Sequence, residues 1–566
     1  MLRALFQSIR LGLGQLLRHL YRRLRPWPNV LELEIEGEVV EDQSGFSWLN
    51  RFLARPAIAF RELILTLRDA EKDPELSALI LYLRPNSLGW SRAQELRQAL
   101  LAFRASGKKT QAFLEEADTL DYFIASACEE VIFTPLGSLG LTGLISEVIY
   151  FKGVLDKLEI KPDLFQAGKY KSAVEPYTRS GMSRAQRESI NSLLDSLYQQ
   201  LVAAVAESRA LSPARVRRAI DRGPYLAPAA REQGLVDYLL YEDQLDDHLE
   251  KQLGEPPRRT SLARYRLWIG PGLNWRDAWR SIPGLALVYA SGVIHLGESR
   301  AYGRLGGESA GSDTLCQALR EARDNPQVQA VVLRVDSPGG SGLASDLIWR
   351  EVSLFQGKKP VVVSMGDVAA SGGYYIAMPA DQILAQPGTL TGSIGVIAGK
   401  INLHGLYHKI GLKKETVRRG QHADLHSDYI PFSESGRQKV KEEMASFYRE
   451  FVSKAAAGRK QDVARMEKAA QGRVWTGEQA KELGLLDGFG GLRQALETAK
   501  RLAGIAEEEK ALLYVLPRRR RLMPPLLSLF LPFSPRLSPA LSELFSLESL
   551  ADSRILALLP FRLRIR

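Results

Sequence analysis

One serine of this chain stands where a nucleophile could work, in the run D-V-A-A-S-G-G-Y-Y at residues 367–375. This residue, Ser371, follows an apolar run typical of a strand and precedes a segment typical of a helix. Small neighbours let a substrate carbonyl reach the hydroxyl, and a helix starting here would direct its positive N-terminus at developing negative charge. The same run is also typical of a turn or a helix N-cap, so the serine alone does not decide the chemistry.

A second glycine-rich loop, D-S-P-G-G-S at 336–341, follows the preceding strand-like run. Gly339 and Gly340 carry no side chain that would shield their backbone N–H groups from a ligand. The loop therefore predicts an oxyanion hole, although P-G-G by itself is equally typical of a turn.

A serine nucleophile needs a base, and the first candidates are the histidines. The chain has 7 of them, and none stands beside Asp or Glu in a recognisable triad motif. His422 and His426 lie in the same half of the chain as the serine, so a Ser–His mechanism stays open.

A lysine can also act as the base if it is neutral. That requires burial to lower its pKa from about 10.4 to roughly 7 to 8, at a cost of about 4 kcal/mol. Lys169 and Lys171, in the run Q-A-G-K-Y-K-S, are the candidates. On a strand they would share a face, so their spacing does not choose between them.

An internal repeat connects these candidates. Shifting the chain by 252 residues superimposes an ungapped series of identical residues that ends at Tyr429, and a shift of 250 aligns R-E-Q-G-L-V-D at 231–237 with K-E-L-G-L-L-D at 481–487. Thr119 stands opposite Ser371, and Ala423 stands opposite Lys171. One copy keeps the hydroxyl and the other keeps the amine, which is expected if both copies build a single site.

The elements that position these loops alternate between strand and helix. In the second copy, 285–294, 328–336 and 360–367 are predicted strands, separated by predicted helices around 313–324 and 342–356. This alternation predicts an α/β fold with a largely parallel, buried sheet. Loops after the strands are where chemistry is expected in such a fold.

Composition limits the other possibilities. A chain of 566 residues is long enough for two to four domains at roughly 150 residues each. Cys128 and Cys316 are far apart, and no Cys/His cluster has zinc spacing, so we expect no disulfide framework, no metal and no cofactor. The net charge of +11 is concentrated at the two ends, which favours attraction to a membrane over binding of nucleic acid.

The two ends differ from the body of the chain. Residues 1–25 hold six Arg and no acidic residue, and their apolar side chains fall on one arc of a helical wheel. The predicted domain order is a basic amphipathic membrane-interface segment at 1–28, an N-terminal repeat with the base at 29–253, a linker at 254–281, a C-terminal repeat with the nucleophile at 282–515, and a basic, Leu- and Pro-rich tail at 516–566.

Together these motifs resemble the signal peptide peptidase A (SppA) family, also called protease IV, in its long two-repeat form. The likeness covers about residues 30–515 and is carried by D-S-P-G-G-S at 336–341, A-S-G-G-Y-Y at 370–375, T-G-S-I-G-V at 391–396 and Y-K-S-A-V-E-P-Y at 170–177. Many long members begin with a transmembrane helix, whereas this chain has the Arg-rich segment.

The resemblance implies two ClpP/crotonase-like repeats, a homotetramer, and cleavage of signal peptides or other apolar peptides at a membrane of the bacterial inner-membrane type. It implies site roles as well: Ser371 as nucleophile, Lys171 rather than Lys169 as general base, Ser393 as the residue that orients the lysine, and Gly339, Gly340 and Gly372 as the oxyanion hole. Two other classes remain in view, a crotonase-like acyl-CoA enzyme and a non-catalytic, membrane-associated scaffold.

Overall fold

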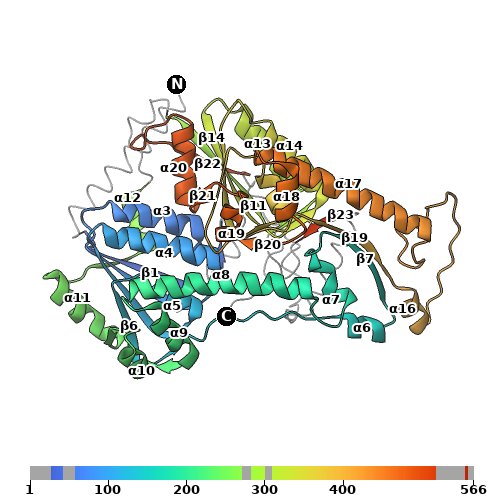
Figure 1. Cartoon of the computed structure of the whole chain (residues 1–566). Helices are drawn as coiled ribbons and strands as arrows, with labels where there is room; N and C mark the ends of the chain where they lie inside the picture. The colour runs from blue at the N-terminus through green and yellow to red at the C-terminus, as the bar shows by residue number, and fades with distance from the viewer. Residues whose placement is uncertain (1–26, 42–57, 271–281, 300–308, 518–554, 559–566) are drawn as a thin grey trace, which may run out of the picture.

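The computed structural model describes residues 27–41, 58–270, 282–299, 309–517 and 555–558, with elements labelled as in Figure 1. Residues 1–26 of the amphipathic segment predicted at the N-terminus and most of the predicted tail lie outside these residues. Within the described ranges, no helix combines the length and apolarity needed to cross a bilayer. The same ranges hold no group of His, Cys, Asp or Glu arranged to bind a metal ion.

The first repeat is built on a mostly parallel sheet. Its strands, in spatial order, are β10 (Arg259–Ser261), β1 (Val30–Gly37), β4 (Ala78–Asn86), β5 (Lys109–Asp118), β6 (Glu130–Gly140) and β8 (Tyr225–Leu226), with β9 (Tyr238–Leu239) also on β6. Only β8 runs antiparallel to its neighbour among these described strands. Part of the range predicted as a linker thus forms β10, which belongs to this sheet.

The second repeat has a sheet of the same kind. Its spatial order is β20 (Val474–Thr476), β18 (Leu390–Gly392), β16 (Val361–Ala370), β14 (Val328–Ser337), β11 (Gly284–Ser291) and β22 (Leu512–Leu516), with β17 (Gln382–Ala385) joining β16 to β21 (Gly488–Phe489). The continuous apolar runs of β14 and β16 fit a parallel sheet that is covered on both faces.

Alternate residues of each strand point to opposite faces of its sheet, and helices cover both faces. In the second repeat, Val331 and Leu333 pack in one cluster with α13 (Ser312–Asp324) and α14 (Gly342–Ser353), while Val332 packs in another with α20 (Leu492–Leu502). In the first repeat, Leu79 and Leu81 lie in the cluster of α3 (Phe60–Glu71), α4 (Trp90–Ala105) and α5 (Thr119–Ala125), whereas Ile80 faces α11 (Leu245–Leu253).

The internal repeat is visible in matched elements. Helices α8 (Arg184–Ser208) and α17 (Glu434–Gly458) each have 25 residues and begin after a serine whose side chain caps the first turn. The identical Tyr122 and Tyr374 donate their hydroxyl hydrogen bonds to equivalent carbonyls, those of Leu235 and Leu485. The predicted fold class, α/β with two tandem repeats and largely parallel sheets, is confirmed.

A third sheet joins the two repeats. Its order is β13 (Ser309–Gly311), β12 (Val293–His295), β15 (Gly339–Ser341), β23 (Ile555–Leu558), β19 (Val396–Asn402) and β7 (Lys161–Ala167). Strand β7 of the first repeat runs antiparallel to β19 of the second over the whole length of both. Figure 1 shows these two strands beside each other, below α17. This pairing places the segment after β7 next to the second repeat.

The remaining elements are shorter or peripheral. They are the paired strands β2 (Val39–Val40) and β3 (Ile58–Ala59), the 3-10 turns η1 (Ser172–Val174) and η2 (Glu242–Gln244), and the helices α6 (Lys152–Lys157), α7 (Glu175–Thr178), α9 (Pro213–Arg222), α10 (Ala227–Glu232), α12 (Leu262–Ile269), α15 (Gly372–Ala377), α16 (His404–Lys409), α18 (Val463–Ala469) and α19 (Gly477–Glu482).

Candidate active site

Ser371 lies between the end of β16 and the start of α15. Its backbone has φ 55° and ψ −112°, a region that costs a non-glycine residue about 1–3 kcal/mol and that concentrates at functional sites. The surrounding structure holds this conformation, since the Ser371 N–H donates to the carbonyl of Gly392 at 2.8 Å. The residue is fully buried in the single chain.

Lys171 comes from the first repeat and lies in the turn after β7. Its Nζ is 2.6 Å from Ser371 Oγ and 2.9 Å from both the carbonyl oxygen and the Oγ of Ser393. The two repeats therefore bring amine and hydroxyl together within one chain, across 200 residues of sequence.

The charge state of Lys171 follows from its burial. The side chain is completely enclosed, and this desolvation lowers the pKa of Lys171 well below its ordinary value of 10.5. A neutral amine has two N–H groups and one lone pair. The two N–H groups can be satisfied by the oxygens of Ser393, which leaves the lone pair for the hydroxyl proton of Ser371.

Ser393, the residue predicted to orient the lysine, also has a constrained backbone. Its φ is 51°, and its N–H donates to the carbonyl of Arg473 at 2.7 Å. Because Ser393 offers two acceptors from a fixed backbone, it can hold the amine in one position.

Lys169 occupies a different environment. It is exposed, and its Nζ lies 3.3 Å from the hydroxyl of Tyr170 and 4.9 Å from the centre of that ring. Neither lysine lies on a strand, because β7 ends at Ala167 and a turn follows. The turn leaves the amine of Lys169 exposed to solvent and places the amine of Lys171 in the interior.

The histidine alternative finds no support in the geometry. His422 Nε2 is 3.2 Å from the hydroxyl of Ser435, and within the described residues the side-chain partner of Ser371 is Lys171.

The predicted oxyanion glycines lie together. A Cβ added to Gly372 would be 3.1 Å from both Gly339 Cα and Gly340 N. The N–H of Gly339 donates to Ser337 Oγ at 3.1 Å. A Cβ on Gly340 would be 1.9 Å from the carbonyl oxygen of Ile294, so only glycine fits against β12 at this point.

Two glycines that sequence reasoning missed hold the lysine turn. Gly168, with φ 109°, approaches Gln471 so closely that an added Cβ would be 2.5 Å from its carbonyl carbon. An added Cβ on Gly472 would be 2.5 Å from Lys171 Cβ. The available sequence signal was the match of Gly168 with Gly420 in the repeat, whereas nothing in the sequence pointed to Gly472.

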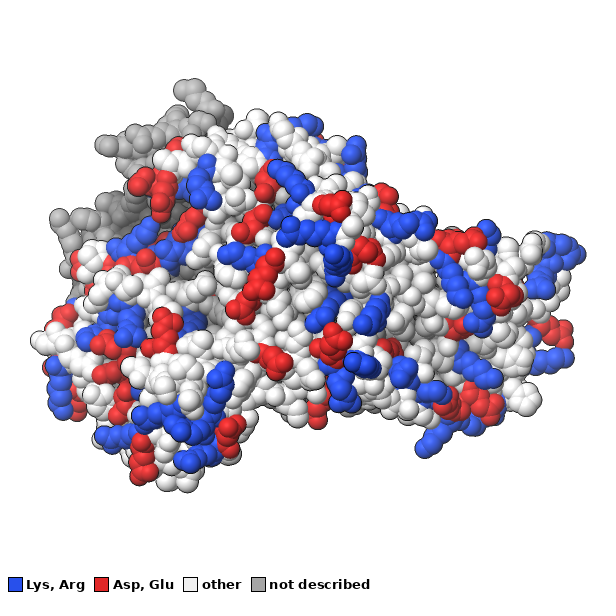
Figure 2. Space-filling view, in the orientation of Figure 1, with Lys and Arg blue, Asp and Glu red and all other residues white. Residues whose placement is uncertain are grey.

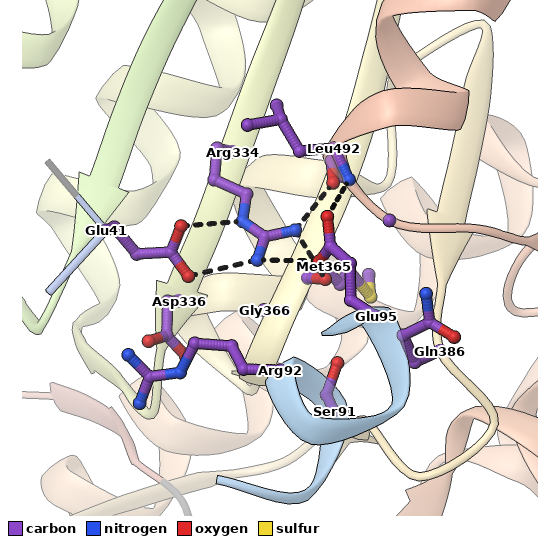
Figure 3. Close-up of polar contacts among 12 residues, drawn as sticks. Glu41, Ser91, Arg92, Glu95, Arg334, Asp336, Met365, Gly366, Gln386 and Leu492 are labelled. Carbon is purple, nitrogen blue, oxygen red and sulfur yellow. Dashed lines mark hydrogen bonds and ion pairs between the residues drawn. The ribbon is translucent and has the colours of Figure 1, made fainter. Parts of the chain in front are cut away.

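A buried ionic cluster, shown in Figure 3, fixes the ends of the strands that carry both loops. Arg334 of β14 is fully buried, donates to both carboxylate oxygens of Glu41 at 3.0 Å, and lies 3.2 Å from Glu95. Beside it, Arg92 of α4 donates to Asp367 of β16 through its backbone and its side chain. The cluster ties the first repeat to the strand ends of the second.

Asp336, the first residue of the D-S-P-G-G-S loop, belongs to the same cluster. Burial raises the pKa of Asp336 to about 6, although the charge of Arg92 opposes the rise. Its carboxylate accepts from the N–H of Val368 at 3.0 Å. This bond joins the loop of the predicted oxyanion glycines to the loop of Ser371.

The chain has relatives among known proteins. The family model described as Peptidase family S49 matches residues 102–254 and again residues 353–506. The chain belongs to peptidase family S49. It is 33% identical to the chloroplastic serine protease SPPA of Arabidopsis thaliana, over 89% of this chain and 74% of that one. It is 34% identical to Protease 4 of Salmonella typhi, over 79% of this chain and 72% of that one.

The S49 assignment confirms the resemblance seen in the motifs and makes the protein a serine peptidase with two copies of the family domain. Among solved structures, a ClpP1 mutant from Listeria monocytogenes is similar at a TM-score of 0.24 and 16% identity, covering 37% of this chain and 94% of that one.

Proposed function

We propose that this S49 peptidase cleaves apolar peptides with Ser371 as nucleophile and Lys171 as general base. The observation that carries the proposal is the 2.6 Å contact between Lys171 Nζ and Ser371 Oγ at a fully buried amine. The roles of the remaining site residues follow from their positions around this pair.

In the proposed mechanism, Lys171 takes the hydroxyl proton as Ser371 Oγ attacks the substrate carbonyl. The tetrahedral oxyanion accepts hydrogen bonds from the N–H groups of Gly340 and Gly372, with Gly339 shaping the loop, because its own N–H is engaged by Ser337. The lysine ammonium then protonates the leaving amine. A water molecule, deprotonated by the same amine, hydrolyses the acyl-enzyme.

The test is the replacement of Ser371 by alanine. Peptide cleavage should be abolished while folding is retained, because the variant removes one oxygen from an otherwise unchanged backbone. Ser353→Ala is a matched control, since the Ser353 hydroxyl bonds within α14 to the carbonyl of Trp349. Turnover that survives in Ser371→Ala at the control's rate would remove this serine from the mechanism.

Apolar specificity is supported by a small cluster near the base. Val174, three residues after Lys171, is buried with Ile397 of β19, and Leu164 packs against both. These side chains come from both repeats and form an aliphatic cluster that is close in sequence to Lys171 and Ser393. Released signal peptides are apolar and are the substrates we propose; cleavage of a Leu-rich peptide should exceed cleavage of the same peptide with Asp at its central positions.

Membrane attachment is proposed for the Arg-rich segment at 1–28. Figure 2 shows acidic and basic side chains interspersed over the face drawn, so this face offers no single-sign surface, whereas residues 1–25 hold six Arg and no acidic residue. Deleting 1–25 should release the protein from anionic vesicles, and high salt should weaken binding of the full chain. Equal vesicle binding with and without the segment would contradict this.

A homotetramer is proposed from the family resemblance. The measurement is the molar mass in solution by light scattering, for which four times 63.0 kDa is expected. A monomeric mass at concentrations that give full activity would refute it.

A further inference from the structure

The sheet that joins the two repeats contains a strand from the far end of the chain. Strand β23 lies between β15 and β19 and is antiparallel to both. Leu556 is paired with Ser341 on one side and with Ile397 on the other. Figure 1 shows β23 beside β19.

Both neighbours of β23 belong to the site. Strand β15 carries Gly339 and Gly340, and β19 begins three residues after Ser393. The helix of the nucleophile, α15, also contacts β23. The slot between β15 and β19 therefore leads to the dyad, and the chain's own tail lies in it.

The direction of β23 matches that of a substrate. Ala557 pairs with Gly340 and Leu558 with Gly339, so the tail advances toward the oxyanion glycines as it runs from Ile555 to Leu558. A peptide on the acyl side of a scissile bond approaches a nucleophile in the same direction. Addition of an extended peptide to open sheet edges is a general mode of peptide capture, in which main-chain bonds give affinity and side-chain pockets give preference.

One side chain of the tail fills an aliphatic pocket. Leu556 is 6% exposed and clusters with Val174 and Ile397, against Leu164 and Ala173. Burial of a leucine side chain favours this arrangement, because it removes apolar surface from water. The pocket is lined by the segment after Lys171 and by the strand after Ser393, so its occupant contacts the two segments that directly follow these site residues.

We propose that residues Ile555–Leu558 are an intramolecular ligand of the peptide groove, which substrate must displace. The inference rests on the proposed function of the groove, and it adds that the enzyme is restrained by its own C-terminal strand. A tethered ligand competes at an effective concentration of order mM when its linker can span the distance, so modest affinity is enough. If the tail filled the groove about nine-tenths of the time, the apparent KM would be raised about tenfold.

The kinetic test compares the full chain with Leu556→Asp, which introduces a charge into the aliphatic pocket. We expect Leu556→Asp to lower KM for a short apolar peptide several-fold, to about tenfold, with kcat unchanged. Leu541→Asp, which adds the same charge to the tail outside β23, is the matched control and should keep the KM of the parent. Equal KM values in all three proteins would overturn the inference.

A binding test separates this inference from the proposed chemistry. The probe is a fluorescent synthetic peptide with the sequence of residues 552–560, measured by anisotropy on the Ser371→Ala protein with and without Leu556→Asp. Tighter binding of the probe to the protein with the altered tail supports occupation of the groove by the tail. This holds even if no variant cleaves any peptide, an outcome that would refute only the proposed function. Equal binding to both proteins, with cleavage intact in the parent, would refute the tail as the occupant.

Discussion

Replacing Gly340 with alanine places a methyl group where the structure has no room for one. The new Cβ would lie 1.9 Å from the carbonyl oxygen of Ile294. An ordinary C···O contact is about 3.3 Å, so β12 and the glycine loop must separate by roughly 1.4 Å. A misplacement of about 1 Å can cost ~100-fold in rate, and loss of one oxyanion donor costs ~100- to 1000-fold, or about 2.7–4 kcal/mol.

We therefore expect Gly340→Ala to lower kcat at least about 100-fold on a short peptide substrate. Gly153→Ala is the matched control, because a Cβ there meets open space within the short helix α6. Circular dichroism and the thermal midpoint report whether each variant is folded. A folded Gly340→Ala protein with kcat within a few-fold of the parent would refute the assignment of this loop to the oxyanion.

Three further predictions concern the residues around the base and the buried cluster. Ser393→Ala removes one of the two acceptors that hold the amine of Lys171, so kcat should fall by at least tenfold and the pH profile should shift, whereas a purely structural role would lower only Tm. Arg334→Leu leaves the Glu41 carboxylate facing a buried apolar group and should lower the free energy of unfolding by about 3–5 kcal/mol in a denaturant titration. The control Lys439→Met removes one partner of an exposed ion pair and should leave Tm unchanged. Lys171→Met should remove a pH dependence from the stability of the protein. Folding lowers the pKa of this lysine, so the unfolded chain binds the extra proton and the stability of the wild type should rise with pH toward 10.5. The measurement is the Tm difference between wild type and variant as a function of pH, and a constant difference would contradict the neutral amine.

The strands of the second repeat could be predicted because their apolar runs are long and bounded by turn residues. The exception is the run 285–294, predicted as one strand, which forms β11 and β12 in different sheets. The break falls at Gly292, whose φ is 82°. Both parts are apolar, so the pattern alone does not reveal the change of sheet.

The sequence alone limits the candidates for the dyad to one serine and two lysines. Choosing Lys171 from the residues alone requires knowing that β7 ends before it and that the turn docks on the segment at Gly472. The strand β23 could not be predicted either, because it follows Pro-rich sequence and pairs with strands that are far away in the chain. Contacts of this kind depend on the whole fold rather than on local pattern.

The central claim is that a neutral Lys171 activates Ser371, and the most direct measurement is the rate of covalent labelling by a fluorophosphonate as a function of pH, with the labelled residue identified by mass spectrometry. Labelling should occur at Ser371 and accelerate with pH through an apparent pKa below 10.5. It should be lost in Lys171→Met and retained in Lys169→Met, because only the first amine is buried against the hydroxyl. An unchanged rate and pH profile in Lys171→Met, or label on a residue other than Ser371, would contradict the account.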